Sequence, residues 1–195
     1  MSNRERLIQI AKDNKLSHLG SSLTALGIIE EIYAKKRSDD KFVLSSGHAH
    51  LAHAVVMESG GGLDAEKTIQ ESGIHCTREA GCDVSTGSLG LGITVAVGLA
   101  LADKGRDVYC LISDGEMAEG SVWEALEVVR KEKITNFKLY VNANGWSAYD
   151  KTDRPILKAK LMSLRIPFEW RDTDSDIGTW AVGLASHYKV ADDEL

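Results

Sequence analysis

The sequence predicts an α/β fold in which a parallel β-sheet is flanked by helices on both faces. Two apolar runs, VYCLIS at 108–113 and FKLYVN at 137–142, have the length and composition of buried strands. A helix is expected between them, at about 117–132, and strands separated by a helix of this length are typical of parallel βαβ units. Ligands of such sheets bind at the carboxyl ends of the strands.

Helices are expected to dominate the first half of the chain. Three are predicted, at 4–15, 22–36 and 48–58. Ser21 or Ser22 is available to cap the second of these helices. The segment KFVLS at 41–45 is expected to be a short strand, whereas residues 59–88, rich in Gly, Ser and Thr, are expected to form loops around one short helix.

The second half is expected to continue the alternation of helices and strands. A helix of small apolar residues at 91–102 precedes the first apolar strand. Ser121 and Glu124 have the spacing of a capping box; the alternative is that this pair lies inside the helix rather than at its start. The remaining elements are a helix near 156–164, a strand near 166–170 and a helix near 178–188. Because no repeat, low-complexity tract or linker-like change in composition interrupts the chain, residues 1–195 are predicted to form a single domain.

Composition excludes several classes of protein. Of the 195 residues, 43% are hydrophobic and 27% are charged, as in ordinary globular domains. The 29 Asp and Glu outnumber the 23 Lys and Arg, which argues against a nucleic-acid partner. No apolar run approaches the roughly 18 residues of a membrane span. The N-terminal sequence MSNRERLIQI lacks the apolar core of a signal peptide, so a cytoplasmic location is expected.

Cysteine and glycine usage narrow the class further. Cys76, Cys82 and Cys110 form no Cys-x-x-Cys pair, so neither a disulfide framework nor a zinc ribbon is indicated. Cys110 lies within an apolar run and is expected to be a small core residue. The 18 glycines, against only two prolines, indicate close backbone approaches within regular structure rather than disorder.

Two oxygen-bearing side chains follow the two central strands. Asp114 comes directly after one strand, and Asn144, 30 residues later, follows the next. If the strands are neighbours, both side chains emerge at the same edge of the sheet. One carboxylate with an amide oxygen and a backbone carbonyl suits Mg²⁺ or Ca²⁺, and Gly115 would let the chain turn tightly beside the metal. The alternative is a pair of unrelated Asp-Gly and Asn-Gly turns.

A glycine-rich run, STGSLGLG at 85–92, enters the helix predicted at 91–102. Such a run lets the backbone approach a diphosphate or a flat ring, as phosphate-binding loops do. Glycines at this density also occur where a helix packs closely on a sheet, which is the alternative interpretation.

Together these features resemble the thiamine diphosphate-binding motif and, more narrowly, the N-terminal, diphosphate-binding domain of the transketolase family. The resemblance covers roughly residues 5 to 175 and implies a thiamine diphosphate-binding fold. It rests on five motifs in the family's order: HLGSSL at 18–23, FVLSSGHA at 42–49, STGSLGLG at 85–92, SDGEMAEG at 113–120 and NGW at 144–146. The chain departs from the family at Ser113, where a glycine is usual, and in loops 34–41 and 59–85, which look shortened.

The resemblance implies a cofactor site. Asp114, the Asn144 side chain and the Trp146 carbonyl would be the protein ligands of the divalent metal. Gly87 would contact thiamine diphosphate through its backbone, and Leu89 would lie against the aminopyrimidine ring. The alternative for Leu89 is an ordinary core leucine.

Three histidines fall where the family has histidines facing the thiazolium and the substrate: His18, His48 and His75. A pKa near neutrality suits imidazole to proton transfer with hydroxyl groups. His75 departs from the family's usual Gly-His-Pro context. His50 and His53 are expected to be helix-surface or packing residues.

Glu119 and Glu124 match acidic positions near the subunit interface of the family, where they belong to a carboxylate network that links paired active sites. Glu119 is therefore included among the candidate catalytic residues. The alternative is that both are solvated helix glutamates, which is the usual role of such residues.

The resemblance also implies a missing half. In this family the glutamate that acts on the pyrimidine ring comes from a second, pyrimidine-binding domain, which a chain of 195 residues has no room to include. The chain is also expected to stop before a C-terminal stretch in which the family carries another histidine near the diphosphate. We therefore expect an α2β2 assembly with a separately encoded pyrimidine-binding subunit.

The function that follows is that of the diphosphate-binding subunit of a split transketolase, which transfers a two-carbon ketol unit from a ketose donor to an aldose acceptor. Sugars are the expected substrates, and the shortened loops leave room for an unusual or large one. Two alternatives stay open. One is another thiamine-dependent carboligase resembling deoxyxylulose-phosphate synthase, and the other is a non-catalytic thiamine diphosphate-binding scaffold subunit.

Overall fold

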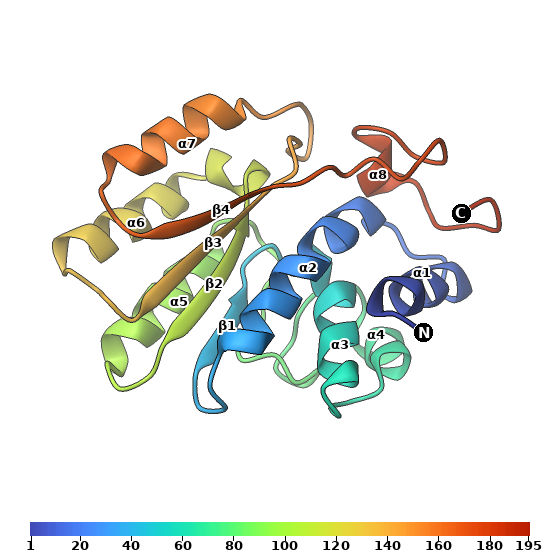
Figure 1. Ribbon diagram of the computed structural model, residues 1–195, viewed down its shortest axis with the longest axis horizontal. Helices are drawn as coiled ribbons and strands as arrows, with labels where there is room; N and C mark the ends of the chain where they lie inside the picture. The colour runs from blue at the N-terminus through green and yellow to red at the C-terminus, as the bar shows by residue number, and fades with distance from the viewer.

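A four-stranded, fully parallel sheet forms the centre of the molecule in a computed structural model that describes residues 1–195 (Figure 1). The strands lie in chain order, β1-β2-β3-β4. Their bounds are β1 Lys41–Leu44, β2 Val108–Ser113, β3 Phe137–Ala143 and β4 Phe168–Asp172. Ser113 at the end of β2 pairs with Asn142 near the end of β3. The predicted parallel α/β architecture is therefore confirmed, and the two central strands end side by side.

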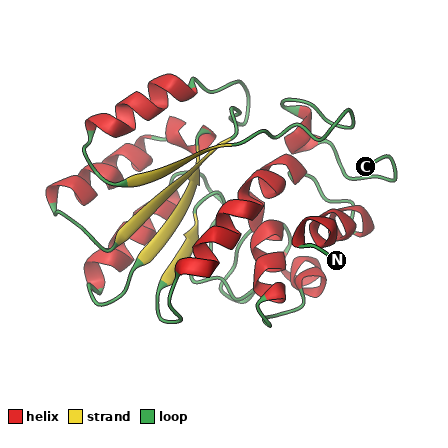
Figure 2. Ribbon diagram, in the orientation of Figure 1, coloured by secondary structure: helices red, strands yellow, loops and turns green.

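Eight α-helices and two short 3-10 helices connect the strands (Figure 2). In the first half these are α1 Asn3–Asp13, α2 Leu19–Lys35, η1 Gly47–Ala49, α3 His50–Ser59 and α4 Ala65–Ser72. In the second half they are α5 Leu91–Ala102, η2 Gly115–Ala118, α6 Gly120–Lys131, α7 Arg154–Ser163 and α8 Ala185–Tyr188. Most of these elements lie within a few residues of their predicted ranges.

The two faces of the sheet bury two separate apolar clusters. Tyr109 and Leu111 of β2 contribute to a cluster with α1 to α4, whereas Cys110 and Ile112 contribute to a cluster with α5, α6 and α7. This alternation follows from the two-residue period of a strand, which sends successive side chains to opposite faces. Helices therefore cover both faces, as predicted, and Cys110 is a fully buried core residue.

Two predicted helix boundaries were wrong. Helix α2 begins at Leu19 rather than at 22, because His18 adopts a left-handed conformation (φ 61°) immediately before it. The predicted helix near 178–188 is reduced to Ala185–Tyr188. Gly178 and Gly183 both have positive φ angles, of 53° and 61°, and a left-handed residue interrupts an α-helix.

Strand β4 and the start of α6 also differ from the prediction. Strand β4 lies at 168–172 rather than near 166–170. Helix α6 begins at Gly120 with Glu119 at its N-cap. Ser121 therefore lies inside the helix, and the Ser121–Glu124 spacing does not mark its start.

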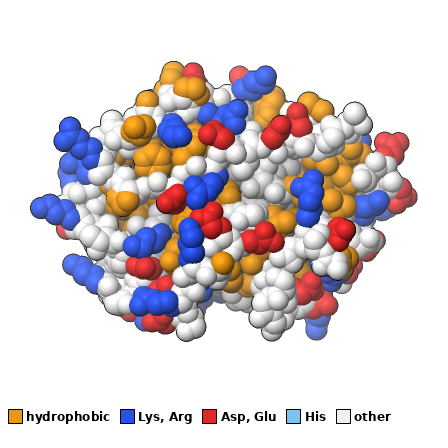
Figure 3. Space-filling view, in the orientation of Figure 1, with side chains coloured by type: hydrophobic (Ala, Val, Ile, Leu, Met, Phe, Trp, Pro, Cys, Tyr) orange, Lys and Arg blue, Asp and Glu red, His pale blue; other side chains and the backbone are white.

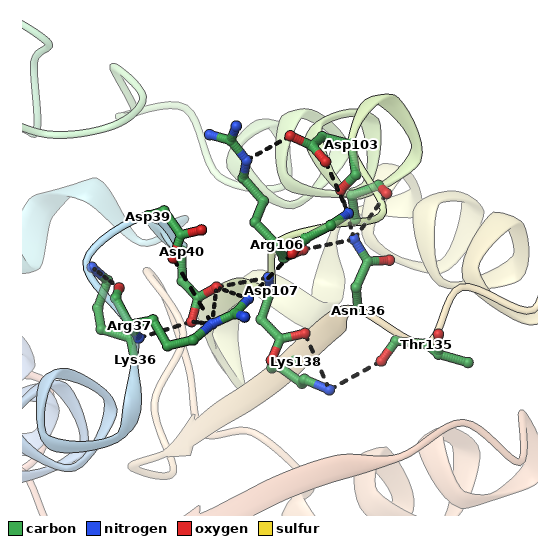
Figure 4. Close-up of polar contacts among 12 residues, drawn as sticks. Lys36, Arg37, Asp39, Asp40, Asp103, Arg106, Asp107, Thr135, Asn136 and Lys138 are labelled. Atoms are coloured by element: carbon green, nitrogen blue, oxygen red, sulfur yellow. Dashed lines mark hydrogen bonds and ion pairs between the residues drawn. The ribbon is translucent and has the colours of Figure 1, made fainter.

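Polar contacts fix the amino ends of the strands, opposite the edge where ligands of such sheets bind (Figure 4). The buried Asp40 carboxylate accepts hydrogen bonds from the Arg37 guanidinium and from the Asp107 backbone N–H. Asn136 Nδ2 donates to three backbone carbonyls at 2.9 to 3.0 Å, one in the last turn of α5 (Ala100) and two in the loop after it (Asp103 and Arg106). These contacts join the loops before β1, β2 and β3 and so set the register of the sheet.

The surface on the side shown in Figure 3 is mixed in charge. Lysine and arginine side chains are interspersed there with aspartate and glutamate. This face therefore presents no basic stripe of the kind that binds nucleic acid. None of the helices combines the length and the apolar character needed to cross a membrane.

Candidate active site

A pocket of about 200 Å³ lies at the carboxyl ends of the central strands. Segments from across the chain line it, including the start of α2, η1, the glycine-rich loop, the ends of β2 and β3, and the C-terminal segment. Eight of the ten candidate site residues are in its lining: His18, His48, His75, Gly87, Leu89, Gly115, Asn144 and Trp146. The fold therefore brings most of the predicted site together. Asp114 lies beneath the lining, and Glu119 lies outside it.

Asp114 is 1% exposed. Its Oδ2 accepts hydrogen bonds from the Gly145 backbone N–H, at 2.9 Å, and from the Thr152 hydroxyl. Its Oδ1 is buried and has no hydrogen-bond partner. Burial raises the pKa of this carboxyl above its usual value, and the hydrogen bonds oppose that shift only in part. An unpaired buried carboxylate oxygen is the group that a cation would satisfy.

The loop after β3 brings two more oxygens to the same place. Asn144 is buried, and its Oδ1 accepts a hydrogen bond from the Trp146 backbone N–H at 3.0 Å. The Trp146 carbonyl lies against Gly115, where an added β-carbon would be 2.7 Å from the carbonyl oxygen. Only glycine allows this approach. The donor set of carboxylate, amide and carbonyl oxygens fits a hard divalent cation such as Mg²⁺ or Ca²⁺.

Two of the predicted histidines lie together in the pocket. The rings of His18 and His48 are 5.3 Å apart between centroids. Burial lowers the pKa of His48 to about 3, and the neighbouring histidines His18, His187 and His75 add to that shift. Burial likewise lowers the pKa of His18, with a smaller effect of His75. Both imidazoles are therefore neutral at neutral pH, so each can accept a proton or a hydrogen bond.

The glycine-rich loop forms another side of the pocket. An added β-carbon on Gly87 would be 3.3 Å from the ring of His75, so this loop and the His75 segment are in tight contact. Leu89 is half-buried and lines the pocket rather than the core. His75 is exposed, at the opening.

Glu119 and Glu124 are exposed, and neither lines the pocket. The chain by itself does not bring Glu119 to the other candidate catalytic residues. Glu119 does lie close to the glycine-rich loop, because a β-carbon on Gly90 would be 2.8 Å from the Glu119 β-carbon.

A fourth histidine, His187, also lines the pocket and was not predicted from the sequence. The sequence analysis expected only that the chain would stop before the C-terminal stretch in which the family carries another histidine near the diphosphate. Its Nδ1 is hydrogen-bonded to Ser21 Oγ at 2.6 Å, and its backbone carbonyl accepts from the His18 N–H. Burial lowers its pKa to about 4, and His18 adds to the shift. Its Nε2 is buried without a partner. No local pattern around His187 marks it, since its contacts are with the opposite end of the chain.

A second missed group is Glu116, which is fully buried behind the glycine-rich loop. Its Oε1 accepts hydrogen bonds from Ser45 Oγ and from the Gly90 backbone N–H. Burial raises its pKa to about 7 despite these hydrogen bonds. Glu116 thus ties the loop that contains Gly87 and Leu89 to β1 and η2. A glutamate two residues after the motif aspartate gives no sequence signal of such a role.

Comparisons with known proteins show the family of the chain. The family model described as 1-deoxy-D-xylulose-5-phosphate synthase matches residues 2–166. The chain is 31% identical over 189 residues to a subunit of apulose-4-phosphate transketolase from Phocaeicola vulgatus, in an alignment that covers 86% of this chain and 67% of that subunit. It is 40% identical over 118 residues to human transketolase, covering 54% of this chain but 19% of the human protein.

Two further proteins, a transketolase subunit and a transketolase of known structure, are also similar to the chain. The 6-deoxy-6-sulfo-D-fructose transketolase subunit SqwG from Clostridium sp. is 32% identical over 151 residues, covering 66% of this chain and 55% of that subunit. The structure of transketolase from Leishmania mexicana superimposes with a TM-score of 0.69 at 22% identity, over 83% of this chain and 30% of that one. The latter shows the fold alone. The chain spans about two thirds of the apulose-4-phosphate transketolase subunit and about a fifth of human transketolase. It belongs to the transketolase family and matches the N-terminal domain that the 1-deoxy-D-xylulose-5-phosphate synthase model describes.

Proposed function

We propose that the chain is the diphosphate-binding subunit of a split transketolase, which transfers a two-carbon ketol unit from a ketose donor to an aldose acceptor. The observation that carries the proposal is the unpaired Oδ1 of Asp114 beside Asn144 and the Trp146 carbonyl, at the floor of a histidine-lined pocket. Two similar proteins are named as transketolase subunits. The proposed domain is the whole of residues 1–195.

Asp114, Asn144 and Trp146 would hold Mg²⁺ or Ca²⁺, and the metal would hold the diphosphate group of thiamine diphosphate. Gly115 allows the Trp146 carbonyl to approach. Gly87 would contact the cofactor through its backbone, and Leu89 would provide an apolar surface for the cofactor's rings. When bound, thiamine diphosphate supplies the carbon that attacks a substrate carbonyl.

The histidines would act on the hydroxyl groups of a sugar substrate. Ser17 Oγ is hydrogen-bonded to Nδ1 of His18 at 2.9 Å, and Ser21 Oγ to Nδ1 of His187. Nε2 is therefore the nitrogen that each ring offers to a substrate. Because burial keeps the imidazoles neutral, they can accept a hydroxyl proton without first losing one. His48 and His75 line the same pocket, with the His48 ring next to that of His18.

A partner protein is part of the proposal. Helix α5 is apolar around its whole circumference, and such helices are normally buried. Yet Leu91, Val95 and Leu101 of α5 are 55%, 43% and 41% exposed. Glu119 lies beside the start of the same helix. We infer that a pyrimidine-binding subunit covers this face in an α2β2 assembly, where Glu119 and Glu124 would meet the paired site.

The decisive experiment co-expresses the chain with a candidate pyrimidine-domain subunit from the same organism and assays ketol transfer with thiamine diphosphate and Mg²⁺. We expect activity from the complex, none from this chain alone, and loss of activity in Asp114→Ala. Asp39→Ala is the matched control, because Asp39 is an exposed aspartate at the opposite edge of the sheet. Activity of the chain alone would refute the split-enzyme proposal, and an active Asp114→Ala complex would refute the metal assignment.

A second candidate is a carboligase resembling 1-deoxy-D-xylulose-5-phosphate synthase, which the description of the matching family model favours. The same complex would then yield a 1-deoxy sugar phosphate rather than a transferred ketol unit. Product analysis by mass spectrometry separates the two reactions. A complex that binds thiamine diphosphate but performs neither reaction would instead support a scaffold subunit.

A further inference from the structure

Beside the pocket, a cluster of histidine and cysteine side chains takes no part in the proposed reaction. His50 comes from α3, and Cys76 and Cys82 come from the loop between α4 and α5. They are 0%, 2% and 6% exposed. One ligand atom from each, an imidazole nitrogen and two Sγ atoms, lies within 4.8 Å of the other two. These are the atoms that transition-metal centres use in proteins.

His53 lies next to this cluster and contacts both of its cysteines, although its ring centroid is 6.3 Å from that of His50 and its nitrogens are not among the three ligand atoms that lie within 4.8 Å of one another. It lies one helical turn after His50 on α3, so both side chains are on the same side of the helix. His53 Nδ1 is 3.5 Å from Cys82 Sγ and 3.8 Å from Cys76 Sγ. Metal–sulfur bonds of about 2.3 Å and metal–nitrogen bonds of about 2.0–2.1 Å place tetrahedral ligands roughly 3.5–3.8 Å apart. The N–S distances of 3.5 and 3.8 Å are those of N···S hydrogen bonds, and they also match the spacing of ligands that share one metal ion.

The surrounding hydrogen bonds favour the same interpretation. Both ring nitrogens of His50 are buried and have no hydrogen-bond partner, whereas nearly all buried polar groups in proteins have one. A metal ion bound by His50 accounts for a nitrogen that the protein leaves unpaired. His53 Nε2 is hydrogen-bonded to the Tyr33 hydroxyl at 2.6 Å. Ligating histidines are characteristically oriented through their second nitrogen in this way.

We propose that His50, Cys76 and Cys82 bind a Zn²⁺ ion as a closed structural centre, and that His53, whose Nδ1 is 3.5 Å from Cys82 Sγ, becomes the fourth ligand when the ion draws the two imidazoles together. Two thiolates balance the double positive charge of the ion, so the buried centre is neutral. Binding releases the two thiol protons to solvent, and no oxidation or reduction takes place. Four protein ligands leave no position for water or substrate, which is the arrangement of structural rather than catalytic zinc.

The spacing of the four ligands along the chain explains why no known zinc motif is recognisable in the sequence. The ligands are His-x2-His on a helix and Cys-x5-Cys on a loop, and neither pair matches a zinc-ribbon spacing. His50 and His53 were expected to be helix-surface or packing residues. A helix-surface position is wrong for both, because they are buried, and a packing role leaves the unpaired nitrogens of His50 unexplained.

The centre would fix a wall of the pocket. Cys76 directly follows His75, and the Cys76 backbone carbonyl accepts a hydrogen bond from the Thr86 N–H at 3.0 Å. Thr86 precedes Gly87 in the glycine-rich loop. A metal that joins Cys76 and Cys82 to α3 therefore holds the loop segments that place His75 and Gly87 against each other.

The test begins with metal binding by the full-length, wild-type chain. We expect about one equivalent of zinc by mass spectrometry of the purified protein. After removal of zinc, titration with Co²⁺ should give visible bands of tetrahedral cobalt and a thiolate-to-cobalt charge-transfer band in the near ultraviolet. The site at Asp114 has only oxygen ligands and cannot give the thiolate band, so the two sites are distinguished even if the proposed function is wrong.

Variants assign the band to the cluster. Cys82→Ser and His50→Gln should abolish the thiolate band or weaken the apparent cobalt affinity by at least tenfold. Cys110→Ala is the matched control, because it removes a buried thiol from the opposite face of the sheet and should leave the band unchanged. Circular dichroism checks that each variant is folded, and the wild-type titration stands if one is not.

Three results would overturn the proposal. These are a wild-type chain that gives no thiolate band with Co²⁺, a band that persists unchanged in Cys82→Ser, and a purified protein in which Cys76 and Cys82 form a disulfide in place of binding zinc. A thiol count under denaturing conditions, with and without reductant, detects the last of these.

Discussion

Replacing Gly115 by alanine tests whether the close contact between η2 and the loop after β3 builds the proposed metal site. The new β-carbon would be 2.7 Å from the Trp146 carbonyl oxygen and 2.8 Å from the Ser147 Cα. Ordinary contact begins near 3.4 Å, and both obstacles are backbone atoms that no side-chain rotation can remove. The loop must therefore move by roughly 0.7 Å away from Gly115.

That displacement affects both stability and binding. Overpacking of this kind lowers the free energy of unfolding by about 1–3 kcal/mol. Mg²⁺ requires near-ideal octahedral ligands at about 2.0–2.1 Å, so moving the Trp146 carbonyl should weaken metal-dependent binding of thiamine diphosphate roughly 10- to 100-fold. Urea unfolding measures the first effect. Quenching of tryptophan fluorescence by the cofactor in saturating Mg²⁺, with the partner protein present, measures the second.

Gly27→Ala is the matched control. Gly27 lies inside α2, and an added β-carbon there meets no atom within 4 Å. Alanine should stabilise the chain by about 0.5–1 kcal/mol, because it restricts the unfolded state and favours the helix. It should leave cofactor binding unchanged. If Gly115→Ala binds thiamine diphosphate and Mg²⁺ as tightly as the wild type does, the assignment of the Trp146 carbonyl as a ligand is wrong.

Three further substitutions test the buried polar groups. Asp40→Ala should lower the free energy of unfolding by about 1–3 kcal/mol at pH 7, but by less below pH 4. The Arg37 guanidinium holds the pKa of this carboxyl below its usual value. The stabilisation is therefore present above the unfolded-state pKa and is lost as the pH falls through the pKa of the folded state. Equal losses of stability in urea unfolding at pH 7 and pH 3 would contradict this. Glu116→Gln should raise the melting temperature relative to wild type at pH 8 more than at pH 5. Burial raises the pKa of Glu116 from 4.5 to about 7, so wild-type stability falls as the pH rises between these values, and a parallel pH profile of the two proteins would contradict this. Asn136→Ala should destabilise the fold by about 1–3 kcal/mol, since it leaves three backbone carbonyls without their shared donor; the exposed neighbour Thr135→Ala should change stability by less than about 0.5 kcal/mol, and similar losses from both would refute the role of Asn136.

The positions of Asp114 and Asn144 at one edge of the sheet could be predicted from the sequence pattern. Each follows a strand that is recognisable by its apolar run, and parallel neighbouring strands end at the same edge of a sheet. The pairing of Ser113 with Asn142 confirms this arrangement. The position of His187 in the pocket could not be predicted from any such pattern. Its hydrogen-bond partner Ser21 is 166 residues away, and a contact of that separation depends on how the C-terminal segment packs.

Glu119 marks a different limit. Its spacing from Asp114 indicates the acidic network of the family, but in this chain its side chain is exposed and outside the pocket. The role expected of it concerns an interface, and a single chain contains one side of an interface. The catalytic role of Glu119 therefore stays a prediction.

The order of strands and helices, the Asp114–Asn144 pair and the glycine-rich run followed from local chemistry: apolar periodicity, glycine at tight approaches, and polar residues where strands end. The pocket histidines His18, His48 and His75 were identified through the resemblance to the transketolase family. Tertiary structure alone decided which polar groups lose their water. It left Asp114 Oδ1 and both nitrogens of His50 buried without partners, and it lowered the pKa of His48 to about 3. It also brought two cysteines beside two histidines from another segment. Desolvation and long-range proximity are properties of the packed chain, so no stretch of sequence contains them by itself.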